Sequence, residues 1–485
     1  MARGPAPSGP TPGGPASPPR LVVAAAAVAD RRGASAALLT ALVLGRALAY
    51  AAGGVDFVLD DWSFAGYRAA NGAMTDAFLR SRPGTWLVQS ALFGIAGEHP
   101  LVLFGLVTVA FLAVTLLLHR VLLRFLAPTL ALATAAVWVL MPNHNTIALW
   151  GATVPTLVAL GLLLGAVLLL ADGRWLPAAV LLALSVVTYE LFVPVCLIAP
   201  FLVPGPLQAD APRRTVRPVH RVVAAGAALA ATAYVAARPL YERNLRLPDP
   251  VVFWSGHFGT GLFATAAPPA PLRLAVAGLV AAAVAVCLVA WARGVRGRDR
   301  GPALVVAGLA VMALSAWVGL TLPLGAFGQN DRLYASSSIG AALVVVGIAR
   351  HAWLRLRAAD PARRGARLAI GAGTAAFVLL CLVGQRISLQ SWLRAGDDAV
   401  AVVAYVRANA EGDPGASHFV IGPERIYRNA VTGIQSGDAK WVFRLTFGDD
   451  APGTLRVADT PADFAARTDD EVLVEWADVV PDAPP

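Results

Sequence analysis

Two adjacent carboxylates, Asp60 and Asp61, are the residues in this sequence to which a chemical role is most readily given. They stand in the segment FVLDDWSFAGYR, among aromatic side chains and directly after an apolar run at 33–53. A carboxylate held at a membrane surface is partly desolvated, which raises its pKa and its basicity. Such a group can remove a proton from a hydroxyl or help to bind a divalent cation. The alternative is an ordinary solvated acidic pair at the end of a helix.

Four further ionisable residues border apolar runs at widely separated positions. They are Arg82, His144, Glu190 and Arg332. Ionisable groups within or against a membrane are costly and usually functional. The topology described below predicts all six residues on one face, so we expect them to line a functional cavity. The competing explanation is that outward loops carry polar residues in any membrane protein, and that a histidine in a short loop is often structural.

The composition places most of the chain in a membrane. Of the 485 residues, 57% are hydrophobic and 14% are charged, whereas a soluble globular protein has roughly 25% charged residues. The formal net charge is +9, which in a soluble protein would raise nucleic acid as a partner. Here the arginines stand between apolar runs, where a membrane protein carries its cytoplasmic charge. We therefore expect a membrane as partner and no nucleic acid.

An apolar run needs about 20 residues to cross a bilayer. The clear runs are 33–53, 100–118, 125–141, 147–171, 222–238, 272–292, 303–325, 335–352 and 368–384. The run 175–204 is too long for one span, and Tyr189–Glu190 in its middle predicts two short helices that meet at a polar turn. The total is about eleven spans. The run 85–97 is too short and contains Gln89, which favours a helix lying in the membrane interface.

The arginines predict the orientation of these spans. With this count, every arginine-rich connection falls on one side, which is the cytoplasm by the positive-inside rule. These connections contain Arg31–Arg32, Arg120, Arg124, Arg174, Arg213–Arg217, Arg293–Arg300 and Arg350–Arg367. We expect a multi-pass plasma-membrane protein with a cytoplasmic N-terminus and an extracytoplasmic C-terminal segment. The outward segments are then 54–99, 142–146, the Tyr189–Glu190 turn, 239–271, 326–334 and the chain from 386.

The N-terminal residues 1–32 predict a disordered cytoplasmic tail, because the first nineteen are almost all Pro, Gly, Ala and Ser. The alternative is a short signal peptide that begins after Arg20. Its cleavage would leave Arg31 and Arg32 outside, against the positive-inside rule. An uncleaved segment near the cytoplasmic face is therefore preferred. Residues 33–385 follow as the transmembrane domain, and they include the extracytoplasmic loop 54–99.

The C-terminal part, 386–485, differs in composition and predicts a small extracytoplasmic α/β domain. The alternating segments HFVIGP, KWVFRLTF and EVLVEW are typical of half-buried strands. Residues 395–411 have the pattern of an amphipathic helix. The predicted fold class is therefore mostly α, a polytopic helical membrane protein with this small domain attached.

The order of these features resembles the GT-C glycosyltransferases, membrane enzymes that use polyprenyl-phosphate sugars. In that family an acidic motif follows the first span, and an Arg-Pro-aromatic interfacial helix precedes the second; here these are DDW and RPGTW. A span ending in a Pro-His/Asn turn follows, here MPNHN, and later two short helices meet at a polar turn, here TYE. GQNDRLYASSSIG is similar to the family's Arg-Tyr segment at a late span. The resemblance covers residues 33–350, and 386–485 carry none of its motifs.

The resemblance implies an inverting transfer of a sugar from a polyprenyl-phosphate donor in the cell envelope. The acceptor would be a glycan, lipid or protein outside the cytoplasm. Asp60 or Asp61 is the implied catalytic base. Arg332 is the first candidate to bind the departing phosphate, because a guanidinium pairs with phosphate at two points, and Arg82 is the second. Tyr334 would hydrogen-bond the same phosphate.

The remaining polar residues are given supporting roles, and one departure from the family pattern keeps other functions open. Glu190, His144 and Asn145 are expected to orient the acceptor or to support the helix turn. No cofactor is assigned, although a divalent cation at the acidic pair is a candidate. The lysine of the family's Lys-Glu turn is replaced here by Tyr189, which leaves open an inactive scaffold with the GT-C fold. A transporter or lipid-linked sugar flippase is the rival of another class, but it does not explain the long first loop with its acidic pair.

Overall fold

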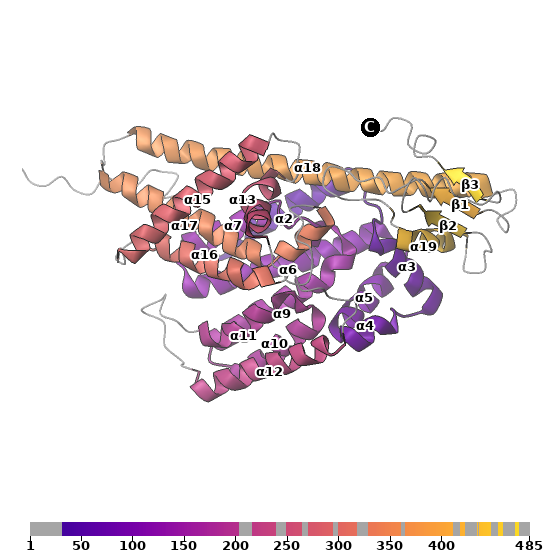
Figure 1. Ribbon diagram of the computed structural model, residues 1–485, viewed down its shortest axis with the longest axis horizontal. Helices are drawn as coiled ribbons and strands as arrows, with labels where there is room; N and C mark the ends of the chain where they lie inside the picture. The colour runs from indigo at the N-terminus through magenta and orange to yellow at the C-terminus, as the bar shows by residue number, and fades with distance from the viewer. Residues whose placement is uncertain are drawn as a thin grey trace, which may run out of the picture.

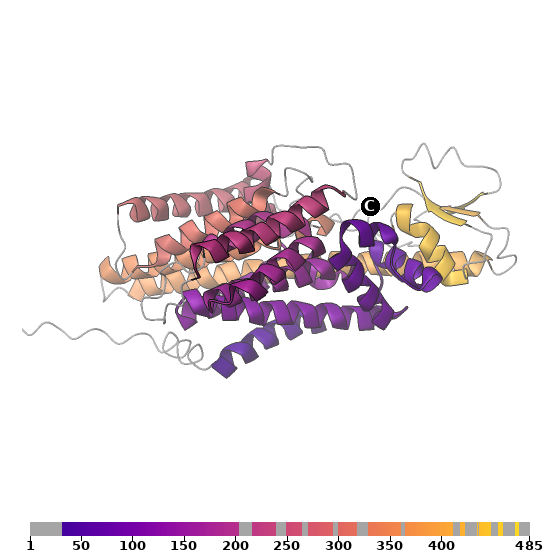
Figure 2. The same ribbon diagram turned by 90° about the horizontal axis from the view of Figure 1, so that it is seen from below.

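The structure is a computed structural model that describes residues 32–202, 216–238, 249–263, 270–293, 299–317, 328–359, 364–410, 418–421, 434, 436–447, 454–458 and 471–474. Within these residues the chain is mostly α-helical, with three short β-strands near the C-terminus. The long helices lie roughly side by side along the long axis of the molecule, as Figures 1 and 2 show. The predicted tail at 1–32 lies outside the described residues except for Arg32.

Seven of the described helices are long and apolar enough to cross a membrane, by length and composition. They are α2 (Arg32–Ala51), α6 (Pro100–Phe125), α9 (Val154–Ala171), α12 (Pro218–Ala236), α15 (Ala270–Ala292), α17 (Ser337–Ala359) and α18 (Arg364–Ala410). The shorter apolar helices are α7 (Pro128–Leu140), α10 (Trp175–Thr188), α11 (Val193–Leu202) and α16 (Gly301–Ser315). The chain is a multi-pass membrane protein. The count of about eleven spans stays a prediction.

Two predicted apolar runs are interrupted, one of them unexpectedly. The run 147–171 was expected to be continuous, but α8 (Thr146–Leu149) ends at an extended Trp150, and a 3₁₀ turn, η1 (Gly151–Thr153), precedes α9. Pro155 lacks the N–H that would bond back to residue 151, which favours this break. The other interruption lies where the sequence predicts it, between α10 and α11, with an extended Tyr189 and the 3₁₀ turn η2 (Glu190–Phe192).

Two helices are longer than the sequence predicts. Helix α6 continues to Phe125, so Arg120 and Arg124 lie in its last two turns rather than in a connection. Helix α18 has 47 residues, a length of about 70 Å, against about 30 Å for the hydrocarbon core of a bilayer. Residues 395–410 of the predicted amphipathic segment are therefore the end of this helix and not a separate element.

The C-terminal part contains a parallel sheet of order β2-β1-β3 among the described residues. Its strands are β1 (His418–Ile421), β2 (Thr454–Val457) and β3 (Glu471–Val474). Strands β1 and β3 lie in two of the segments predicted as strands. The third, KWVFRLTF, forms the end of helix α19 (Ser436–Phe447), so that prediction was wrong. The buried residues Ala439, Val442 and Phe443 of α19 have helical spacing. In so short an apolar run, the sequence alone does not distinguish this spacing from the alternation of a strand.

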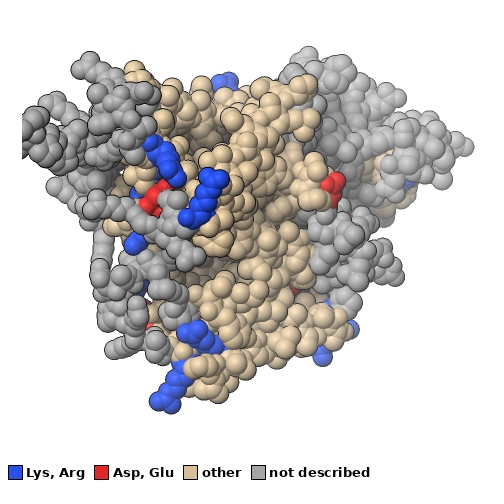
Figure 3. Space-filling view, turned by 60° about the vertical axis from the view of Figure 1, so that its left-hand side comes forward, with Lys and Arg blue, Asp and Glu red and all other residues tan. Residues whose placement is uncertain are grey.

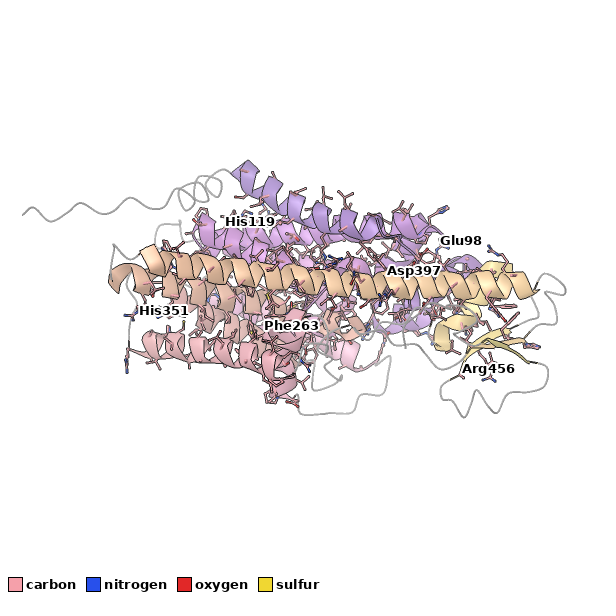
Figure 4. All side chains as sticks on the ribbon, turned by 90° about the horizontal axis from the view of Figure 1, so that it is seen from above. Glu98, His119, Phe263, His351, Asp397 and Arg456 are labelled. Carbon is pink, nitrogen blue, oxygen red and sulfur yellow. The ribbon has the colours of Figure 1, made fainter. Side chains whose placement is uncertain are left out.

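The first loop and the C-terminal part lie at the same end of the molecule (Figures 1 and 2). The loop forms α3 (Asp60–Asn71), α4 (Asp76–Ser81) and α5 (Pro83–Ala96). Helix α19 packs against α3, where the Trp441 and Tyr67 rings meet edge to face with centroids 5.4 Å apart. Figure 4 shows Asp397 and Arg456 toward this end and His119 and His351 toward the opposite end. We call the end with α3 the site end.

Glycines bring α16 and α17 into close contact. A Cβ added at Gly308 would lie 2.5 Å from the carbonyl oxygen of Gly340, and the converse distance is also 2.5 Å. One heptad away, Gly301 and Gly347 repeat the arrangement at 2.7 and 2.8 Å. Small residues let membrane helices approach closely enough for backbone packing. This pair of glycine contacts therefore fixes the helix that follows Arg332 and Tyr334.

We predict that Gly308→Leu lowers the thermal unfolding temperature of the protein in detergent, because a side chain there forces α16 and α17 apart. Overpacking of this kind costs about 1–3 kcal/mol. Gly278→Leu is the matched control, since a Cβ at Gly278 of α15 meets no atom within 4 Å. Equal unfolding temperatures for the two variants would show that the α16–α17 contact contributes nothing to stability.

Candidate functional site

The acidic pair forms the first turn of α3, immediately after a strained residue. Leu59 has φ 53° and ψ −136°, and it is the non-glycine residue with positive φ in the described chain. Its side chain is fully buried, so packing holds it in a conformation that leucine rarely adopts. Such strain concentrates at functional sites. Here it turns the chain so that Asp60 and Asp61 begin a helix, whose free N–H groups favour carboxylates.

Asp61 ties α3 to the interrupted entry of α9. The side chain is buried, and its Oδ1 accepts a hydrogen bond from the backbone N–H of Ala152 at 2.8 Å. A Cβ at Gly151 would lie 2.9 Å from the same oxygen, so glycine is needed for this approach. Gln89 of α5 donates to the carbonyl of Ala152 at 3.3 Å. The turn η1 is thus held from both α3 and α5.

Asp60 lies beside Arg332, although the two are far apart in sequence. Burial raises the pKa of the half-buried Asp60, and the nearby positive charge of Arg332 opposes that rise. Arg332 belongs to the 3₁₀ segment η4 (Gly328–Tyr334), and its Cζ lies 5.2 Å from the centre of the Trp150 ring. The centre of the Trp150 ring lies 6.0 Å from the centre of the Trp392 ring in α18. The Asp60 carboxylate therefore lies in the field of a guanidinium that stacks on one of two adjoining buried indole rings.

A layer of buried neutral side chains adjoins Arg332 through Tyr334. His144 bonds Asn143 through Nδ1 at 3.0 Å, and Asn143 bonds Nδ1 of His257 at 2.6 Å. His257, on α13 (Pro250–Phe258), meets the Tyr334 ring edge to face at 4.8 Å. Burial lowers the pKa of His144 well below its usual range and that of His257 to about 3, so both rings are neutral at pH 7. This layer, with the buried Asn145, can offer uncharged hydrogen-bonding groups only.

Arg82 and Glu190 do not join this group but pair with each other. They form an ion pair whose side chains are 11% and 13% exposed. The Arg82 guanidinium also lies 5.1 Å from the centre of the Tyr189 ring, and Thr85 donates to the carbonyl of Thr188. These contacts bind the start of α5 to the break between α10 and α11. Tyr189 therefore supports Arg82.

The described residues do not assemble a metal site around the acidic pair. No group of three or more His, Cys, Asp or Glu side chains in the described part of the chain is arranged to hold a metal ion.

The structure thus separates the predicted residues into two sets. Asp60 and Asp61 begin α3, and Arg332 lies near Asp60, with Tyr334, His144 and Asn145 in the adjoining buried layer. Arg82 and Glu190 form an ion pair with each other. Sequence reasoning missed four contributors: Arg46, Gln89, Trp150 and His257. For Arg46 a signal was present, since it is an arginine inside the first apolar run. Gln89 also stands out as a polar residue inside the apolar run 85–97, whereas Trp150 and His257 carry no signal that separates them from ordinary core or loop residues.

Comparison with known proteins gives limited similarity. A scan against protein-family models and a search of curated proteins find no match. Among solved structures, the chain is similar to the single-particle cryo-EM structure of the arabinofuranosyltransferase AftD from Mycobacteria, with a TM-score of 0.43 and 16% sequence identity. The similarity covers 92% of this chain and 32% of that chain, so this chain spans about a third of the length of that protein. The function has to be inferred from this chain's own residues.

We predict that Arg82 acts as a structural anchor. Removing one partner of a buried ion pair costs about 3–5 kcal/mol, so Arg82→Gln or Glu190→Gln should markedly lower the unfolding temperature. The double variant should lose less than the sum of the single losses. Asp172→Asn is the matched control. Asp172 pairs with Arg124 at the surface, where the two side chains are 41% and 53% exposed, and such an exposed pair is worth about 0–1 kcal/mol.

The opposite pattern would make Arg82 a substrate ligand. In that case Arg82→Gln would leave the unfolding temperature unchanged and weaken the binding of a polyprenyl-phosphate sugar.

Proposed function

We propose that the protein is a membrane glycosyltransferase that moves a sugar from a polyprenyl-phosphate donor to an acceptor hydroxyl outside the cytoplasm, with inversion. The observation that carries this proposal is the meeting of Asp60 with Arg332 at the site end of the helical bundle. A base for the acceptor and a cation for the leaving phosphate are the two groups that the reaction needs. The GT-C-like order of motifs over residues 33–350 supports the same reaction.

Asp60 is the better of the two candidates for the base. It is half-buried, whereas Asp61 is 3% exposed and accepts the Ala152 N–H bond. Burial raises the pKa of Asp60, which strengthens it as a base while it stays ionised. Asp61 then has the role of positioning α3. General acid assistance is less needed than in glycoside hydrolysis, because phosphate is already a good leaving group.

The reaction would proceed by one displacement. Asp60 takes the proton of the acceptor hydroxyl as its oxygen attacks the anomeric carbon from the face opposite the phosphate. The bond between that carbon and the phosphate oxygen breaks, and the electron pair leaves with the polyprenyl phosphate. Arg332 neutralises the charge on the leaving phosphate through paired N–H bonds. A single displacement inverts the anomeric configuration.

The orientation proposed for this reaction places the site end outside the cytoplasm. Figure 3 shows the opposite end, where Lys and Arg side chains stand around the rim. Arg124, Arg217, Arg293 and Arg300 lie at or next to the ends of helices α6, α12, α15 and α16. The positive-inside rule makes this end cytoplasmic. The domain limits 33–385 and 386–485 belong to the same proposal, and the C-terminal part is proposed to stand outside the membrane beside α3.

Asp60→Asn should reduce transfer by about 10²–10⁴-fold, the usual cost of losing a general base. Binding of the sugar donor should persist. Asp61→Asn should cost less, because its amide oxygen can still accept the Ala152 N–H bond. The measurement is transfer from radiolabelled polyprenyl-phosphate sugars in membranes, with expression level matched. Asp76→Asn, at the exposed start of α4, is the control. Near-normal transfer by the Asp60→Asn, Asp61→Asn double variant would end the enzyme proposal.

Arg332→Lys should weaken transfer by about 10–100-fold, because a charge-assisted bond worth about 1.5–3 kcal/mol is lost. Lysine keeps the charge but not the two-point geometry of the guanidinium. The same assay measures this loss over a range of sugar-donor concentrations. Full turnover with unchanged affinity for the sugar donor would mean that Arg332 only contacts lipid headgroups, and that the phosphate binds elsewhere.

A further inference from the structure

Arg46 is a charged residue inside the first span that the proposed reaction does not use. It lies on α2, and its guanidinium Cζ is 5.3 Å from the centre of the Phe111 ring of α6. Its Nη2 donates to the carbonyl of Asn145 at 3.4 Å. A charge at membrane depth is costly and points to a function or a partner. The partner here is Asp331, whose carboxylate attracts Arg46 electrostatically.

Asp331 itself is a hub of buried hydrogen bonds. Its side chain is 2% exposed, and Oδ1 accepts the backbone N–H of Thr146 at 2.9 Å. The Thr146 side chain and the backbone of Asn145 also hydrogen-bond this carboxylate. Asp331 therefore fastens η4 to the start of α8. An uncharged residue could keep part of this hydrogen bonding, but it could not attract Arg46.

The contact between Asp331 and the start of α8 also affects the position of Arg332. Helix α8 runs from Thr146 to Leu149, and the next residue is Trp150, the ring on which Arg332 lies. Asp331 and Arg332, two successive residues of η4, thus contact the beginning and the end of the segment from Thr146 to Trp150. Asp331 holds its beginning, and Arg332 lies against the residue at its end. Moving Asp331 would shift η4 against Trp150 and turn the Arg332 guanidinium away from Asp60.

We propose that Asp331, which Arg46 attracts electrostatically, is a positioning residue that holds the Arg332 guanidinium in place to bind the phosphate of the lipid-linked substrate. This proposal rests on the proposed function and adds that binding of the phosphate depends on the charge of a second, buried residue. Asp331 acts through Arg332 and touches no substrate.

The charge of Asp331 is sensitive to pH in the physiological range. Burial raises its pKa to about 7, and the hydrogen bonds from Thr146 and the charge of Arg46 limit that rise. Besides Asp60, which lies near Arg332 and is tested separately below, the titratable groups in this region are His144, His257 and Tyr334. Burial keeps both histidines neutral and raises the pKa of Tyr334, so they do not change charge near pH 7. Because the ionised form of Asp331 attracts Arg46, the positioning is complete above pH 7 and is lost as the pH falls below it.

The test measures binding of polyprenyl methyl phosphate to the full chain in nanodiscs. This diester carries one negative charge at all pH values used and has no sugar, so neither acceptor nor sugar identity matters. For the unmodified protein we expect the dissociation constant to rise about tenfold between pH 8.5 and pH 5.5, in line with protonation of a group of pKa about 7. Asp331→Asn should bind weakly at both pH values, with the pH dependence gone.

Two further variants keep the test decisive if Asp331→Asn does not fold. Arg46→Gln removes the charge that favours ionised Asp331, so the fall in affinity should begin at higher pH. Asp60→Asn should retain the pH dependence, which would exclude Asp60 as its source. A residue with a merely structural role would lower the unfolding temperature and leave the pH dependence of binding unchanged.

The outcomes separate this inference from the proposed function. Tight binding that needs Arg332 but is equal at both pH values, or is unchanged by Asp331→Asn, overturns the positioning role alone. Absence of any binding by the unmodified protein at either pH overturns the proposed phosphate site, and the positioning role with it.

Discussion

The hydrogen bond from the Ala152 N–H to the buried Asp61 carboxylate is the interaction on which the arrangement of the site depends. It joins α3, in the first loop, to η1 at the entry of α9. Because Asp60 precedes Asp61 and Trp150 lies two residues before Ala152, this bond fixes Asp60 relative to the indole ring that Arg332 contacts. Without it, the buried Asp61 carboxylate would lose a hydrogen-bond donor that offsets its desolvation.

Interrupted helices supply the backbone N–H and C=O groups that form hydrogen bonds of this kind with side chains. The breaks at Trp150 and Tyr189 and the 3₁₀ segment η4 are parts of the described chain where backbone groups are freed from α-helical bonding. In a membrane protein such irregular backbone is tolerated where it is buried in protein. Here the freed groups bond side chains from other elements: Ala152 N–H bonds Asp61, Thr146 N–H bonds Asp331, and the Thr188 carbonyl accepts from Thr85.

The sequence predicted those features that depend on composition and run length. The apolar runs identify the membrane helices, and the overlong run 175–204 places the break at Tyr189, because both follow from bilayer thickness. Asp60, Asp61 and Arg332 stand out because ionisable groups beside apolar runs are rare. By contrast, Trp150 is itself apolar, so averaged hydropathy gives no sign of the break. The pairing of Arg82 with Glu190 joins residues 108 positions apart and has no local signature. Segment KWVFRLTF is too short for its period to be decided.

The most direct measurement is a cryo-EM structure of the protein in nanodiscs with a polyprenyl-phosphate sugar bound to the Asp60→Asn variant, which should hold the intact lipid. The phosphate should lie within about 3 Å of the Arg332 guanidinium. The anomeric carbon should lie between the phosphate and the side chain at position 60. A phosphate bound at Arg82 and Tyr189, with position 60 remote from the sugar, would contradict the account.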